Sequence, residues 1–199
     1  MSNRLVKGTI LGVIAALGFT APNAFAVSYT GTLGTADIAG TDGLLTGNGE
    51  YASGVTFSWI VNDGDHPGFW TYVYTFDGPK PTPPSAPALS HIIIEVSANF
   101  IGGIGGDLED STPGLDEGPS TFTPGAGNPN MPGNLFGLMF QNLGDDEPFV
   151  LIIVTARSPV WVDVYYKGGS GVSGGGDGAN AGFNVADPPN PPANGSVLD

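Results

Sequence analysis

Alternating apolar and polar residues predict short β-strands along most of the chain beyond residue 26. The clearest alternation covers residues 55–61, and a second one covers residues 69–76, with aromatic side chains on one face. A period of two residues places alternate side chains on opposite faces of a strand. Residues 62–68, NDGDHPG, separate the two runs and are of types that favour turns. Together these segments predict a β-hairpin.

The most hydrophobic stretch after residue 26 spans residues 149–167, FVLIIVTARSPVWVDVYYK. Residues 149–156 are almost wholly apolar and rich in β-branched side chains, which is typical of a strand covered on both faces. Pro159 interrupts the pattern because proline lacks the N–H group that a sheet ladder needs. Beyond Pro159 the alternation predicts a second strand. The face of this strand that is predicted to belong to the core comprises Val160, Val162, Val164 and Tyr166. The stretch therefore predicts a hairpin at the centre of the domain.

Further strands are predicted at residues 27–35, 89–101 and 134–141, and no stretch shows the spacing of an amphipathic helix. The proline-rich segment 78–87 cannot enter the interior of a sheet, so we expect it to carry the chain from one sheet to another. Roughly seven or eight short strands with such a crossing favour an all-β fold. We expect an antiparallel β-sandwich of jelly-roll or Greek-key type.

Glycine and proline concentrate in segments that are predicted to lie outside the strands. Residues 36–49 predict a loop, and residues 102–133 predict a longer one, broken only by residues 120–123. A loop of that length is unusual in a compact domain, so we expect it to be either functional or mobile. Residues 168–199 predict a flexible tail, which leaves residues 27–167 as the folded domain.

Residues 1–26 have the organisation of an export signal. Arg4 and Lys7 precede an apolar run at residues 8–19, and AFA at residues 24–26 forms a small-x-small cleavage site. The apolar run is too short to span a bilayer comfortably, which favours a cleaved signal peptide over an uncleaved anchor. We therefore expect an exported protein, extracellular or on the cell surface, without a transmembrane segment in the mature chain.

The chain is strongly acidic, with 19 acidic and 5 basic residues and a formal net charge of −14. Two basic residues and no acidic residue lie in the export signal, so 3 basic and 19 acidic residues remain and the mature charge is −16. Such a charge repels nucleic acid and anionic membranes. Cysteine is absent, which excludes disulfides, thiolate metal sites and cysteine nucleophiles.

Two short motifs could carry chemistry. GVSGG at residues 171–175 fits the G-x-S-x-G pattern of a hydrolase, but both histidines precede it and its surroundings have a linker composition, so we treat the match as accidental. GGIGGDLED at residues 102–110 is close to a calcium-binding nonapeptide, although an acidic residue replaces the required large apolar one. Looser calcium binding is the hypothesis for the clustered carboxylates Asp107, Glu109 and Asp110, and ordinary solvated acids are the alternative. No other cofactor is predicted.

Aromatic residues on the predicted strand at residues 69–76 lead to a carbohydrate-binding hypothesis. Trp70, Tyr72 and Tyr74 share one face of that strand. Sugars stack on exposed aromatic rings, and a β-sandwich offers flat faces for such stacking. The alternative is that these rings belong to the core, because their neighbours are apolar.

A family resemblance rests on residues in the second half of the chain. They are, in chain order, SPVW at residues 158–161, Asp163, Tyr165, Lys167-Gly168 and a glycine-rich run that ends in NAGF at residues 180–183. This order resembles secreted PEP-CTERM (exosortase-sorted) surface proteins, and residues 70–76 and 89–96 look similar to the same group. The chain differs at Val162 and Val164, and it lacks the Pro-Glu-Pro sorting motif. The resemblance implies a location at the cell surface and no particular chemistry.

Three classes of function follow, in order of preference. The first is a non-enzymatic structural or interaction protein, secreted or on the cell surface, whose partner is extracellular polysaccharide or another surface protein. The second is a carbohydrate-binding module that uses exposed aromatic residues. The third is an enzyme, for which no motif fits its context. We therefore predict that the protein is not an enzyme.

Overall fold

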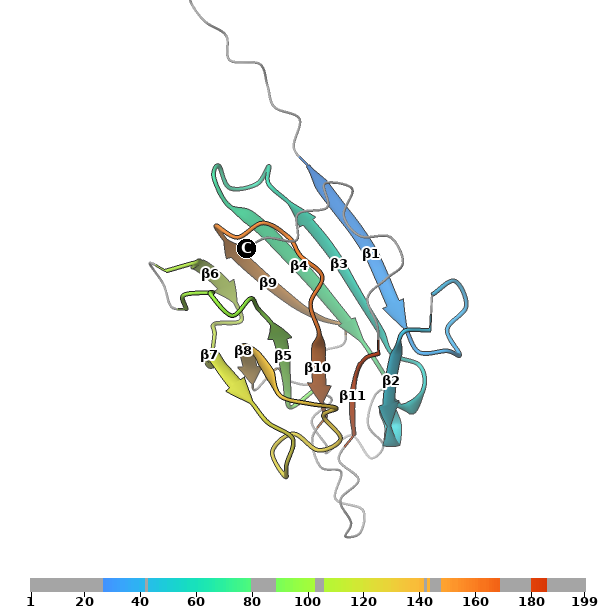
Figure 1. Cartoon of the computed structure of the whole chain (residues 1–199). Coiled ribbons are helices and arrows are strands. Elements are labelled where there is room, and N and C mark those ends of the chain that lie inside the picture. The colour runs from blue at the N-terminus through green and yellow to red at the C-terminus, as the bar shows by residue number, and fades with distance from the viewer. Residues whose placement is uncertain are drawn as a thin grey trace, which may run out of the picture.

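The chain folds into two antiparallel β-sheets that enclose a common core (Figure 1). This computed structural model describes residues 27–41, 43–79, 89–102, 106–141, 143, 148–168 and 180–185. The five-stranded sheet has the order β1 (Ser28–Gly34), β3 (Thr56–Asn62), β4 (Trp70–Asp77), β9 (Phe149–Thr155) and β6 (Leu108–Thr112). The six-stranded sheet has the order β2 (Leu45–Asn48), β11 (Ala181–Asn184), β10 (Val164–Lys167), β5 (His91–Glu95), β8 (Leu135–Gln141) and β7 (Glu117–Phe122).

The predicted all-β sandwich is confirmed. The described residues contain one short 3-10 turn, η1 (Gly49–Ala52), and no helix with the length and hydrophobicity of a membrane span. The hairpin predicted from alternation is present, because β3 pairs with β4 along its whole length. The chain also changes sheets between β4 and β5, as the proline-rich segment predicts. Residues 80–88 of that segment lie outside the described residues.

The hairpin predicted at residues 149–167 is wrong. Strand β9 pairs with β4 and β6 in the five-stranded sheet, whereas β10 pairs with β5 and β11 in the six-stranded sheet. Residues 156–163, here called the crossing segment, connect the two sheets and contain no strand. The proline was correctly placed at a break, but the break separates two sheets instead of two paired strands.

Three segments that were predicted to lack strands contribute to the sheets. The glycine-rich loop at residues 36–49 contains β2, and the long loop at residues 102–133 contains β6 and β7, although its predicted break at residues 120–123 does overlap the end of β7. The predicted tail contains β11, which lies between β10 and β2, so the domain extends to residue 185 and its predicted end at residue 167 is wrong. Residues 169–179 and 186–199 of the predicted tail lie outside the described residues. Strands β2 and β11 have four residues each, too few for a recognisable alternation.

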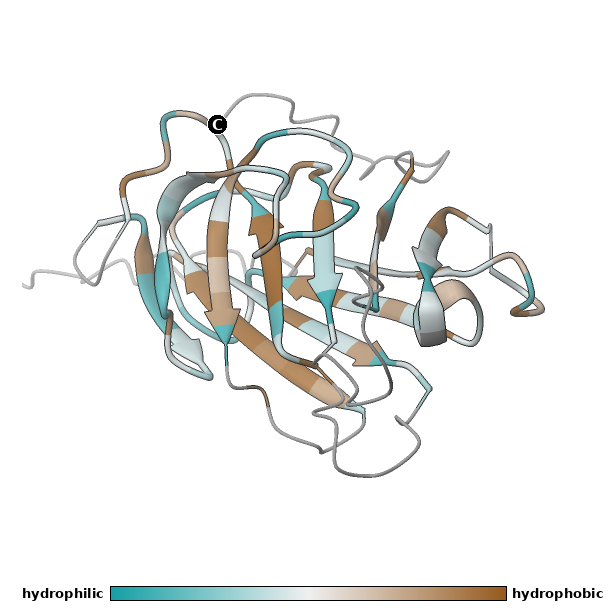
Figure 2. Cartoon of the chain, turned by 90° about the horizontal axis from the view of Figure 1, so that it is seen from below, coloured by the Kyte–Doolittle hydropathy of each residue, from teal (hydrophilic) through white to brown (hydrophobic). Residues whose placement is uncertain are grey.

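Buried side chains form two clusters on opposite sides of the six-stranded sheet. The larger cluster fills the space between the sheets and includes Ile92, Ile94 and Tyr166. The smaller cluster lies on the outer face of the six-stranded sheet and includes Ile93 and Tyr165. The run Ile92-Ile93-Ile94 is continuous because both faces of β5 are covered. Figure 2 shows the corresponding concentration of hydrophobic residues in the strands.

Residues 123–134, here called the covering loop, close the smaller cluster from outside. The Tyr165 hydroxyl donates to the carbonyl of Pro129 at 2.9 Å, and the Lys167 ammonium donates to the carbonyl of Gly127 at 3.0 Å. His91 Nε2 is hydrogen-bonded to Asn128 Oδ1 at 3.1 Å. The second half of the long predicted loop is therefore ordered by contacts with three side chains of the sheet.

Candidate functional site

The aromatic side chains predicted to bind sugars point into the sandwich. Trp70, Tyr72 and Tyr74 are half-buried on the inner face of β4 and pack against the core between the sheets. Trp70 stacks on Tyr29 with ring centroids 6.1 Å apart, and Tyr74 stacks on Phe57 at 5.2 Å. The predicted exposed platform is therefore wrong. The alternation correctly places Trp70, Tyr72 and Tyr74 on one face of the strand, but this face points into the sandwich.

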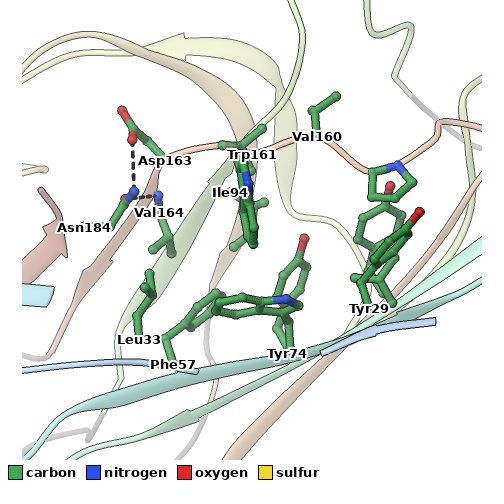
Figure 3. A pocket seen from close by; sticks show the side chains of 15 residues that line it. Tyr29, Leu33, Phe57, Tyr74, Ile94, Val160, Trp161, Asp163, Val164 and Asn184 are labelled. Carbon is green, nitrogen blue, oxygen red and sulfur yellow. Dashed lines mark hydrogen bonds between the residues drawn. The ribbon is translucent and has the colours of Figure 1, made fainter. Parts of the chain in front are cut away.

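The rings of Tyr72, Tyr74, Tyr29 and Phe57 line a cleft between the sheets. The crossing segment forms its opposite wall, and Figure 3 shows Trp161 reaching toward the sheet that carries Tyr74 and Phe57. Trp161 contacts Trp59 edge to face, with ring centroids 5.4 Å apart at an interplanar angle of 82°. Burial raises the pKa of the Tyr74 hydroxyl, so this group is a neutral phenol throughout the physiological pH range.

The crossing segment is fixed at both ends. At its start, the Tyr72 hydroxyl donates to the carbonyl of Arg157 at 3.0 Å, and Arg157 Nη2 donates to Asp107 Oδ2 at 2.9 Å. At its end, the backbone N–H of Asp163 donates to Glu95 Oε2 at 2.9 Å, and the N–H of Glu95 donates to the Asp163 carbonyl at 2.9 Å. These bonds hold Trp161 and its neighbours against the core.

The cleft is too small for a sugar ring. Its two chambers, which meet at Val160 and Val162, have cavity volumes of about 50 Å³ each. A cavity that takes one benzene molecule is about 150 Å³. With the crossing segment in place, the cleft is therefore a narrow apolar gap in the core.

The residues predicted to bind calcium do not converge on one point. Asp107 is paired with Arg157, and the hydrogen bond from this guanidinium holds the pKa of Asp107 below its ordinary value. Glu109 and Asp110 are exposed on β6, where Asp110 Oδ1 accepts the N–H of Ser111 at 2.8 Å. Within the described parts of the chain, no three acidic or histidine side chains form a group that could hold a metal ion. Asp107 instead fixes the start of the crossing segment.

A larger groove lies on the outer face of the six-stranded sheet, between the covering loop and strands β10, β11 and β2. Phe183 divides it into two parts with cavity volumes of about 250 Å³ and about 160 Å³. The Phe183 ring is half-buried and packs against the smaller hydrophobic cluster. The groove is thus several times larger than the cleft and has an aromatic ring at its centre.

Polar side chains surround Phe183 on several elements. They are Asn48 from β2, Asn130 and Asn134 from the covering loop, Asn184 from β11, and Asp163. Asn184 is buried and fixed, because its Oδ1 accepts the N–H of Val164 at 2.7 Å and its Nδ2 donates to Asp163 Oδ1 at 3.1 Å. Asn130 and Asn134 are exposed. Amide groups can both donate to and accept from a ligand hydroxyl, so the groove suits a polyhydroxylated ligand.

The backbone of β11 lies very close to the neighbouring strands, and this packing positions Phe183 beside the groove. Gly182 lies against the Tyr166 ring, and a Cβ atom at this position would collide with that ring and with the carbonyl of Thr46. Only glycine therefore allows β11 to sit between β2 and β10 at this spacing. The neighbouring residue, Phe183, then points to the opposite face, toward the groove.

Sequence reasoning missed this groove. The sequence indicates the NAGF segment only through the family resemblance and predicts that it lies in the tail, and it predicts Asn134 as the first residue of a strand. Nothing matches this chain among known protein families, characterised proteins or solved structures.

Proposed function

We propose that this chain is an exported, non-enzymatic protein that binds extracellular polysaccharide through the groove around Phe183. The observation that carries the proposal is an aromatic ring surrounded by amide side chains in a groove of sufficient volume. The apolar face of a sugar ring would pack on Phe183, while its hydroxyls would bond to the surrounding amides. The sequence resemblance to secreted PEP-CTERM surface proteins supports the same location.

The charge of the molecule indicates which polysaccharides fit. The groove lining contains one carboxylate, Asp163, and no cationic side chain among the described residues, and the whole chain carries −14. An anionic polysaccharide would be repelled by this field. We therefore expect neutral sugars to bind and uronic acids to bind poorly.

The same lining argues against glycoside hydrolysis. Such chemistry ordinarily uses two carboxylates, about 5–10 Å apart, on either side of the scissile bond. Asp163 is the only carboxylic acid among the described residues of the groove, and it is already hydrogen-bonded to Asn184. The proposed role is therefore binding without cleavage.

Binding to an array of neutral and acidic oligosaccharides tests the proposal. We expect Phe183→Ala and Asn134→Ala each to weaken binding of neutral glycans by at least about tenfold, or about 1.4 kcal/mol. The exposed Asn134 should tolerate alanine without loss of stability, which separates binding from folding. Trp70→Leu serves as the control, because Trp70 stacks on Tyr29 at the edge of the cleft and lies outside the groove; it should leave affinity unchanged if the variant folds. Loss of binding in Trp70→Leu together with normal binding in both groove variants would overturn the proposal.

Export is a separate part of the proposal with its own measurement. We expect the exported protein to begin at Val27, because the cleavage site ends at Ala26. Intact-mass analysis of protein recovered outside the cytoplasm measures this directly. A recovered chain that still contains residues 1–26 would contradict cleavage.

A further inference from the structure

The groove around Phe183 crosses three strands instead of following one. Strand pairing places Tyr165 of β10 opposite Phe183 of β11, and Phe183 opposite Thr46 of β2. These three residues therefore form a row across the outer face of the six-stranded sheet, where Figure 1 shows the three strands side by side. The covering loop buries Tyr165 completely, whereas Phe183 and Thr46 are half-buried and line the groove.

The two parts of the groove lie next to each other along this row. The larger part, of about 250 Å³, lies over β10 and β11, and the smaller part, of about 160 Å³, lies over β11 and β2. Adjacent strands are about 4.8 Å apart, so the two parts are displaced by about the length of one sugar unit in a polysaccharide. Each part is at least as large as a cavity of about 150 Å³ that takes one benzene ring.

The larger part has polar groups that are not engaged elsewhere among the described residues. The Asn134 amide, which is exposed, makes no hydrogen bond to these residues. Asp163 uses only Oδ1, which accepts from Asn184, so its Oδ2 can accept from a ligand hydroxyl. One amide and one carboxylate oxygen are therefore open to a sugar ring in this part.

The smaller part has a separate set of open polar groups on other segments of the chain. The Thr46 hydroxyl and the Asn130 amide make no hydrogen bond to the described residues. Asn48 uses its Oδ1 to accept the N–H of Ala181 at 3.0 Å, which leaves its Nδ2 as a donor for a ligand. The two parts thus share the Phe183 ring but have independent donors and acceptors.

We propose that the groove holds two successive units of a neutral polysaccharide, one in each part, with Phe183 beneath the linkage between them. This arrangement rests on the proposed function, to which it adds the number of sugar units and their direction across the strands. The hydroxyls of each unit bond to the open groups of its own part. A disaccharide loses its translational and rotational freedom once but gains both sets of contacts, so it binds more tightly than one unit.

A site for two units distinguishes a polysaccharide from free sugar. A monosaccharide fills one part and leaves the other in contact with water. A single unit should prefer the larger part, because the carboxylate of Asp163 forms stronger hydrogen bonds than an uncharged acceptor. Free monosaccharides around the cell would therefore compete weakly, and the protein would stay attached to the polysaccharide in their presence.

Nuclear magnetic resonance titration of the full chain, expressed with its own export signal and purified, tests the two-unit site. The probes are glucose and mannose with their β-1,4-linked di-, tri- and tetrasaccharides. In a series that binds, the disaccharide should have a dissociation constant at least about tenfold below that of the monosaccharide, and longer chains should gain less than about threefold more. The disaccharide should shift the side-chain amide signals of both Asn130 and Asn134.

Variants in the two parts should have different effects on this gain. Thr46→Val removes a hydroxyl from the smaller part and keeps a side chain that suits a strand. Asn130→Gly removes the amide and tolerates the φ of 58° found there. Each should reduce the gain from monosaccharide to disaccharide to below about threefold. Asn134→Ala, in the larger part, should weaken both ligands alike. Thr30→Val is the matched control, because Thr30 is an exposed threonine of β1 in the other sheet, and it should leave both affinities unchanged.

The possible outcomes separate the two-unit site from the proposed function. Equal affinities of monosaccharide and disaccharide in every series that binds would overturn the two-unit site and leave polysaccharide binding standing. A gain that continues with each added unit up to the tetrasaccharide would also overturn it, because the site would then be longer than the two parts. Equal effects of Thr46→Val and Thr30→Val would exclude the smaller part. Failure of every neutral saccharide to bind would overturn the proposed function and the two-unit site together.

Discussion

Val164→Asp is expected to abolish the native fold, whereas Asp163→Asn is expected to leave it nearly unchanged. Val164 is 4% exposed in the core between the sheets and pairs with Ile94 of β5. An aspartate there would place an unpaired charge among apolar side chains, which costs about 3–5 kcal/mol or more. Domains are stable by only about 5–15 kcal/mol, so most of the folded population would be lost.

The neighbouring residue provides the matched control. Asp163 is exposed, and its Oδ1 accepts a hydrogen bond from Asn184 at 3.1 Å. Asparagine keeps that acceptor, so the expected loss of stability is within about 0.5 kcal/mol. Thermal melting followed by circular dichroism measures both changes. If the two variants melted at the same temperature, the inward orientation of Val164 would be incorrect.

Acid is expected to destabilise the protein through His91. This side chain is 7% exposed, and burial together with the positive charge of Lys167 lowers the pKa of His91 to about 4, from an ordinary value of 6.5. The groups that face it are Lys167 from β10, the Tyr165 ring at 5.8 Å, and Asn128 from the covering loop. The hydrogen bond to Asn128 raises the pKa but is outweighed by burial and charge.

The direction of this pH effect on the free energy of unfolding follows from the numbers of protons that the native and unfolded states bind. Between pH 6.5 and pH 4 the unfolded chain carries a protonated histidine and the native chain a neutral one, so the unfolded state binds more protons. The free energy of unfolding is therefore largest above pH 6.5 and falls as the pH decreases toward 4, by about 3 kcal/mol in all. The pKa values of Asp37 and Asp107 are lowered from 3.8, so the stability that these carboxylates contribute is lost below this window.

Chemical unfolding at a series of pH values between 4 and 7 measures the effect. His91→Gln should remove most of the decline in this range. His66→Gln is the control, because His66 lies in an exposed turn between β3 and β4, and this variant should retain the decline. A His91→Gln variant with the same pH dependence as the unchanged protein would show that another group is responsible.

The sequence by itself determined the fold class and the positions of the longer strands. In β3 and β4 the alternation extends over seven or eight residues, and the turn between them has the residue types that turns require. It also showed that Trp70, Tyr72 and Tyr74 share one face. These features are local, because the two-residue period of a strand is a property of the backbone alone.

Only the tertiary structure decided which sheet each strand joins and where a groove could form. Alternation groups side chains by face but does not specify which strand pairs with which, so the sequence predicts a hairpin for β9 and β10 although they lie in different sheets. Strand β11 has four residues, and its place depends on the contact of Gly182 with Tyr166. The groove combines residues from four separate segments of the chain, one of which contains Phe183. Such a site exists only after the sheets pack, because it depends on distances between segments that are far apart in the chain.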